Sequence, residues 1–337
     1  MSAAFLYLQE KGQPEGENRA QGALIMPNQG KNDIVAKEQM SDKLSLIPQG
    51  INFVSAFRPN KLVENQALTK IYNAFVQEFY PSELPLAEEG VAKLKEESGF
   101  DPEAFSELLV FGDLSSREYW GGIGEGNFVE ERLITEVEKA RDEKFDLKDY
   151  KGYRIYADGR DEFWICFLSK GRLALGFKEM VEDVIEVEKG EKEHAFGDTY
   201  ETFALLEEEL VKVFFEVPEG ARNWLRGKTQ KLTEFSIELP LDILRMGIVL
   251  SGRDDLLRLQ VQVYYPNGEK AQDLVEVVEG LKRIAIAMIR ISEINELLRR
   301  MDANISDSSV MLLLEVPTAD FTKSIKKGKE FLTKVFK

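Results

Sequence analysis

Residues 108–140, LLVFGDLSSREYWGGIGEGNFVEERLITEVEKA, contain the signals that decide the fold of this protein. An apolar run ends at Gly112, a second begins at Tyr119, and a polar turn at residues 113–117 separates them. A helical pattern follows from about residue 128 to residue 140. Strands joined by so short a turn pair antiparallel, because parallel neighbours need a crossover of a dozen or more residues. The stretch therefore predicts an antiparallel hairpin followed by a helix.

The four glycines between residues 121 and 126 are similar to a dinucleotide-binding loop. That fingerprint needs GxGxxG after the first strand of a parallel βαβ unit. Here Asn127 stands in place of the third glycine, the pairing is antiparallel, and glutamates surround the loop without a basic residue. The stretch instead predicts an inner strand whose glycines allow close packing, followed by a helix that Asn127 caps.

A second stretch with the same plan occupies residues 246–281. Its turn lies at residues 252–255, and its helix begins at about Glu269, just after Asn267. An earlier pair also matches, because residues 51–60 and 211–220 each contain an apolar strand that ends at a proline turn. These correspondences indicate an internal duplication.

The remaining segments complete each copy. Residues 150–177 predict three strands joined at Asp158-Gly159 and Lys170-Gly171, with a helix after them, and residues 304–337 predict a shorter hairpin and a closing helix. We therefore expect an α+β fold of two similar units, each a mainly antiparallel sheet with helices packed on one face. An N-terminal arm or tether is expected over 1–46, the first unit over 47–198 and the second over 199–337, with the two units packed together.

Composition excludes several classes of function. The 337 residues carry a net charge of −16, with a pI of about 4.8, so the surface repels phosphate backbones and no nucleic-acid partner is expected. Cys166 is the single cysteine and His194 the single histidine, which excludes an intramolecular disulfide and a CxxC metal site. No cofactor is expected.

Individual polar residues suggest no catalytic or metal site. Glu191, His194 and Asp198 have helical spacing, but flanking glycines favour a solvated loop over a metal site. Cys166 alternates on an apolar strand, where a cysteine is usually inert. With 60 acidic residues, no carboxylate pair stands out as a catalytic acid and base, so we assign no catalytic residue.

Aromatic residues supply the candidate site. Tyr119, Trp120 and Trp164 lie on neighbouring predicted strands, and on an uncovered sheet face they would form an apolar patch for a ligand or partner. The alternative is that they fill the core. Because side chains alternate along a strand, Tyr119 and Trp120 cannot both point inward.

The two chain ends each allow two interpretations. The apolar residues 3–8 are either the remnant of a membrane anchor or an ordinary strand. The lysine-rich helix expected after Phe321 either lies weakly on an anionic membrane or docks through its apolar stripe.

The segment YKGYRIY and the strands and helix after it follow a pattern of a Y.G..IY strand, an apolar strand, an LALG strand, a VEDVI helix and a KG pair. The positions that match are Tyr150, Gly152, Tyr156, Leu173, Gly176, Val181, Ile185 and Gly190. This pattern resembles a group of archaeal and bacterial envelope-anchored, lipoprotein-like proteins of unknown function, over about residues 51–220. The resemblance implies an outward-facing tethered domain without known catalytic residues. This sequence has neither a lipobox cysteine nor a full hydrophobic segment at its start, so an anchor is expected upstream.

Three hypotheses for function follow. The first is a non-enzymatic binding domain tethered outside the cell, whose ligand is an unknown protein partner or an apolar molecule. The second is a soluble carrier with a cavity between sheet and helices for a lipid-like or other apolar ligand, and the cytoplasm is the alternative location to the envelope. The third, a carboxylate-based enzyme, needs two acidic side chains that converge in a cleft.

Overall fold

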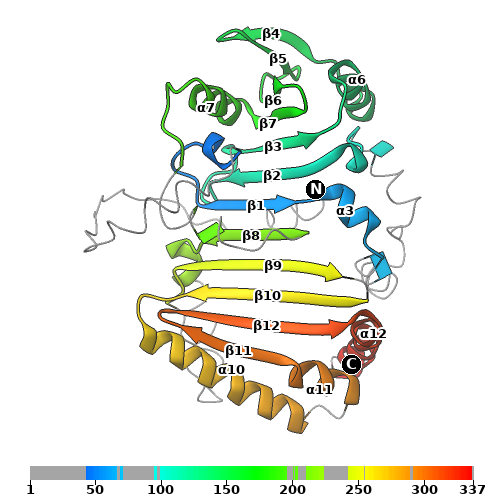
Figure 1. Ribbon diagram of the computed structural model, residues 1–337, viewed down its shortest axis with the longest axis vertical. Helices are drawn as coiled ribbons and strands as arrows, with labels where there is room; N and C mark the ends of the chain where they lie inside the picture. The colour runs from blue at the N-terminus through cyan, green and yellow to red at the C-terminus, as the bar shows by residue number, and fades with distance from the viewer. Residues whose placement is uncertain are drawn as a thin grey trace. The chain divides into compact units, whose positions relative to one another are not determined.

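Within the residues that the structure describes, 12 strands form one antiparallel sheet in the computed structural model of the protein (Figure 1). The structure describes residues 43–66, 69–70, 95–96, 99–195, 200, 202–203, 210–223, 242–253, 255–288 and 291–335. The chain divides into Met1–Gln39 and Met40–Lys337, so every described residue belongs to the second of these units. The expected N-terminal arm lies outside the described residues, except for its last four, of which Leu44 and Leu46 are buried in the core.

The strand order across the sheet is β11-β12-β10-β9-β8-β1-β2-β3-β7-β6-β5-β4. The strands are β1 (Phe53–Phe57), β2 (Phe105–Gly112), β3 (Trp120–Gly126), β4 (Asp146–Tyr150), β5 (Tyr153–Ala157), β6 (Phe163–Ser169), β7 (Arg172–Phe177), β8 (Val211–Glu216), β9 (Arg245–Arg253), β10 (Leu256–Tyr264), β11 (Met301–Ser306) and β12 (Ser309–Pro317). The helices are η1 (Leu44–Leu46), α3 (Pro59–Glu64), η2 (Pro102–Ala104), α6 (Glu130–Arg141), α7 (Lys178–Glu188), α10 (Gly268–Met288), α11 (Ser292–Arg299) and α12 (Thr318–Val335).

The two predicted units meet in the middle of this sheet, where their first strands, β1 and β8, pair antiparallel (Figure 1). From there the sheet extends outward on each side, first through a hairpin and then through a second set of antiparallel strands, four on the β1 side and two on the β8 side. β2, β3 and β7 follow β1 on one side, and β9, β10 and β12 follow β8 on the other. The α+β class is confirmed. The expected boundary between residues 198 and 199 stays a prediction.

The two faces of the sheet are defined by strand alternation. Face A carries Val54 of β1 and Trp164 of β6, and face B carries Ser55 and Ile165, because paired residues in the register point the same way.

Helices cover both faces, which differs from the expectation that they would pack on one. On face A, α7 contributes buried residues to a cluster that contains Val54 and Trp164. On face B, α6 packs on Ile165, and α10 packs on Val263 of β10. The reason is visible in β6, whose FWICFL run is apolar at consecutive positions and so needs cover on both sides.

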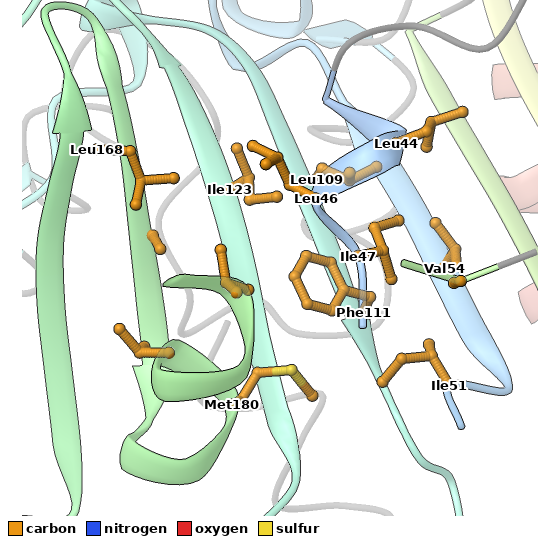
Figure 2. Close-up of a cluster of buried hydrophobic side chains, with 14 of the residues drawn as sticks. Leu44, Leu46, Ile47, Ile51, Val54, Leu109, Phe111, Ile123, Leu168 and Met180 are labelled. Atoms are coloured by element: carbon orange, nitrogen blue, oxygen red, sulfur yellow. The ribbon is translucent and has the colours of Figure 1, made fainter. Parts of the chain in front are cut away.

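The main core lies on face A (Figure 2). Phe111 of β2 and Ile123 of β3 belong to the same cluster as Met180 of α7, and Leu46 of η1 joins it next to Leu109 and Ile123. Phe111 and Met180 are fully buried. This core attaches α7 and η1 to the sheet, and it leaves face B of the central strands to other contacts.

Details at helix ends differ between the two predicted units. The Lys270 N–H donates to Oδ1 of Asn267 at 3.0 Å, as expected at the start of α10. The prediction for Asn127 is wrong, because α6 begins two residues later than such a cap requires, after Val129, and has no side-chain cap. The Asn127 N–H instead donates to the Ala104 carbonyl at 2.9 Å, which ties the end of β3 to η2.

Candidate functional site

Tyr119 and Trp120 point to opposite sides of the sheet, as the alternation of strand residues predicts. Tyr119 packs against the face A core, and its Oη donates to Oδ2 of Asp183 on α7 at 2.5 Å. Burial and, next, this hydrogen bond raise the pKa of the phenol. Tyr119 therefore holds α7 on the sheet.

Trp164 is a core residue on face A, with 4% of its surface exposed. Its indole Nε1 donates to Oδ1 of Asp161 at 2.7 Å, and the Lys178 ammonium lies 5.1 Å from the ring centroid. Lys148 also donates to Asp161, at 2.6 Å. The Lys148 hydrogen bond, followed by that of Trp164, lowers the pKa of the Asp161 carboxyl. Both polar and apolar parts of the Trp164 side chain are thus engaged inside the protein.

Trp120 lies apart from these two residues, half-buried on face B. Its ring covers Gly112 of β2, where an added Cβ would lie 2.4 Å from Cδ2 of the indole. The indole Nε1 donates to the Ser116 carbonyl at 2.8 Å, and the Phe53 ring centroid lies 5.2 Å away. The three predicted aromatic residues therefore do not form one surface.

A row of aromatic rings continues from Trp120 across the centre of the sheet. Phe53 of β1 stacks on Phe215 of β8, with centroids 6.5 Å apart, and Phe215 pairs in register with Met246 of β9. All four side chains are half-buried. The row crosses from one unit to the other, because β1 and β8 are the strands that join them.

The side chains around this row form what we call the central band, the face B residues of β2, β1, β8 and β9. Its members are Leu108 and Val110; Phe53, Ser55 and Phe57; Val211, Val213 and Phe215; and Met246, Ile248 and Leu250, with Trp120 at its margin. None of these side chains is charged, and Ser55 alone is polar. Every member except Ser55 is half-buried, whereas Ser55 is 1% exposed.

The band was missed in the sequence because β1, at its centre, is apolar on both faces. In FVSAF the face A residues Val54 and Ala56 are apolar like Phe53 and Phe57 of face B, so period two carries little contrast there, whereas in VKVFFE the two charged residues lie on face A. The signal that points to it is the serine, a lone polar residue in an apolar strand. Only the pairing of β1 with β2 and β8 shows that this serine lies among apolar side chains.

The remaining sequence candidates lie elsewhere. Cys166 on β6 is fully buried, and burial raises the pKa of its thiol to about 12. His194 forms a bridge with Pro48, Glu191 pairs with Lys151, and Asp198 lies outside the described residues. Within the described ranges no group of three or more His, Cys, Asp or Glu side chains is placed to hold a metal ion.

Carboxyl groups gather along α7 in structural roles. Burial raises the pKa of Glu182. Its helix neighbour Asp183 accepts from Tyr119, and Glu186 accepts from Tyr150 at 2.9 Å and from Lys151 at 2.7 Å. These hydrogen bonds hold α7 against the sheet, so the carboxyl groups of α7 have a structural role.

The C-terminal helix α12 packs against α11 and β12. Ser324 on α12 is buried, and its hydroxyl donates to the Glu293 carbonyl of α11 at 3.2 Å. In the part of the chain that the structure describes, no helix has both the length and the apolar character needed to cross a bilayer.

Comparisons with known proteins identify no family. No family model matches the chain, and no curated protein matches it. Among solved structures, it is similar to crystal forms IV, III and I of TP0453, with TM-scores of 0.46, 0.44 and 0.43 and identities of 8%, 9% and 11%. Each alignment covers 84% of this chain, and 96%, 97% and 96% of the TP0453 chain respectively. Values this low say nothing about ligand or activity.

Proposed function

We propose that this protein is a non-enzymatic binding domain, tethered at the cell envelope and facing outward, whose central band holds an apolar ligand. The single observation that supports the proposal is the half-buried row of Trp120, Phe53 and Phe215 in a band without any charged side chain. Apolar side chains with a few polar groups are the usual lining of small-molecule sites. The tether rests on the sequence resemblance and remains part of the proposal.

Trp120 provides a local optical probe of the band. The chain has three tryptophans, so replacing Trp164 and Trp224 by Phe leaves Trp120 as the single emitter. Titration with a dibrominated acyl chain should quench this emission, because bromine quenches tryptophan only at short range. The quenching should saturate when the band is occupied. A matched protein that keeps Trp164 instead should stay unquenched, since that indole is buried on face A. Equal quenching in both proteins, or in neither, would contradict binding at the band.

A soluble carrier of a lipid-like ligand is the alternative, and the same apolar band favours it. Location separates the two hypotheses. Fractionation of source cells should place a tethered domain in the envelope fraction, open to added protease in intact cells, whereas a carrier would appear in the cytoplasmic fraction and resist protease. Native mass spectrometry after gentle purification should detect the bound ligand in either case.

A further inference from the structure

Ser55 occupies the centre of the central band. Its neighbours Val54 and Ala56 are buried in the face A core, so the Ser55 side chain points to face B. On that face it lies between Val110 of β2 and Val213 of β8, its two cross-strand partners.

The Ser55 hydroxyl has no hydrogen-bond partner among the described residues, although the residue is 1% exposed. A buried polar group left unpaired is destabilising, and most such groups in folded proteins are paired. Both cross-strand partners are valines, so an aliphatic side chain is accepted at this level of the sheet. Packing alone therefore gives no reason for a serine here.

We propose that the Ser55 hydroxyl donates a hydrogen bond to a neutral acceptor, such as an ester carbonyl, on the apolar ligand of the central band. This inference rests on the proposed function. A neutral acceptor is favoured over a carboxylate, because no member of the band is a cation and an unpaired charge in apolar surroundings is costly. One donor also matches one acceptor, which distinguishes this ligand class from headgroups with many polar atoms.

The selectivity expected from this contact is small and measurable. A neutral hydrogen bond contributes about 0.5–1.5 kcal/mol net, which corresponds to a preference of roughly 2- to 12-fold for an ester over a hydrocarbon of equal length. The fluorescence of Trp120 can measure this preference, because the Trp120 ring contacts Phe53. Phe53 is two residues from Ser55 on the same face.

The test uses the protein with Trp120 as its single tryptophan and three probes of equal chain length. These are dibromostearic acid methyl ester, dibromo-octadecane and ionised dibromostearate. The ester should bind tightest with Ser55 present. Ser55→Ala should remove the preference for the ester while keeping the affinity for dibromo-octadecane, which also shows that the variant is folded. Ser324→Ala serves as the control, because its hydroxyl bonds to the Glu293 and Asp320 carbonyls away from the band.

Each outcome has a distinct meaning. A loss of ester preference in Ser55→Ala, but not in Ser324→Ala, supports the inference. Equal affinity for ester and hydrocarbon with Ser55 present overturns it and leaves the binding function intact, and so does tighter binding of ionised dibromostearate. If no probe quenches Trp120, the proposed function itself fails.

Discussion

Gly112→Ala should disrupt the aromatic row by forcing Trp120 away from the sheet. The added methyl group would lie 2.4 Å from Cδ2 and 2.6 Å from Cε3 of the indole, so the ring must move by about 1 Å or more to regain normal contact. Overpacking of this kind costs about 1–3 kcal/mol. Loss of the Nε1 hydrogen bond to Ser116 adds about 1 kcal/mol. We expect the free energy of unfolding to fall by about 2–4 kcal/mol.

A double-mutant cycle isolates the contribution of the ring. In a Trp120→Ala background the indole is gone, and the nearest remaining obstacle to the new methyl group is the Tyr119 carbonyl at 2.8 Å. Gly112→Ala should then cost about 1 kcal/mol, which gives a coupling energy of about 1–3 kcal/mol between the two positions. Urea unfolding followed by circular dichroism measures all four corners of the cycle.

Gly124→Ala is the matched control, because its methyl group would meet the Phe105 ring, at 2.8 Å, instead of Trp120. Its cost should be the same with and without Trp120. If Gly112→Ala is equally costly in both backgrounds, Trp120 does not cover Gly112 and the geometry of the row is refuted.

Three further predictions concern face A. Asp161→Asn should reduce the loss of stability in acid. Because the pKa of Asp161 is lowered in the folded protein, its carboxylate contributes stability at pH values above the ordinary Asp pKa of about 3.9. This contribution is lost as the pH falls from there toward the pKa of the folded state. Unfolding from about pH 6 to 3 should show a shallower decline in the variant, and an unchanged slope would contradict the role of Lys148 and Trp164. Tyr119→Phe should destabilise by about 1–2 kcal/mol through loss of the bond to Asp183, as urea unfolding would measure, and a neutral change would show that this bond does not hold α7. Cys166 should not react with a disulfide reagent at about pH 8 until the protein unfolds, because its thiol is buried with a pKa of about 12; rapid reaction in the native state would refute its placement.

Strong local signals were sufficient for much of the fold. The β2–β3 hairpin was predictable because two apolar runs flank a polar turn, and the Asn267 cap because its side chain acts within one helical turn. β4 was missed because DLKDY is an exposed, charged edge strand without an apolar pattern. Such charges are typical of edges, where they discourage pairing with other chains.

The candidate site was less predictable than the fold. Tyr119, Trp120 and Trp164 were grouped as one candidate site because all three are aromatic residues on adjacent predicted strands, whereas the structure places Trp120 on face B and the other two on face A. Their contacts with Asp183 and Asp161 depend on segments distant in the sequence. Ser55 was not predicted as a site residue, because a serine in a strand gives no sign of a site until its neighbours on the sheet are known.

By itself the sequence determined the antiparallel pairing of its hairpins, the α+β class and the opposite facings of Tyr119 and Trp120, because turn length and strand alternation act over a few residues. Only the tertiary structure decided that β1 pairs with β8, so that Phe53 meets both Trp120 and Phe215. It also decided that helices cover both faces and that Ser55 lies between two valines. Those outcomes depend on which distant strands pair and in what register, and the apolar runs of β1 and β8 leave that choice open until the sheet forms.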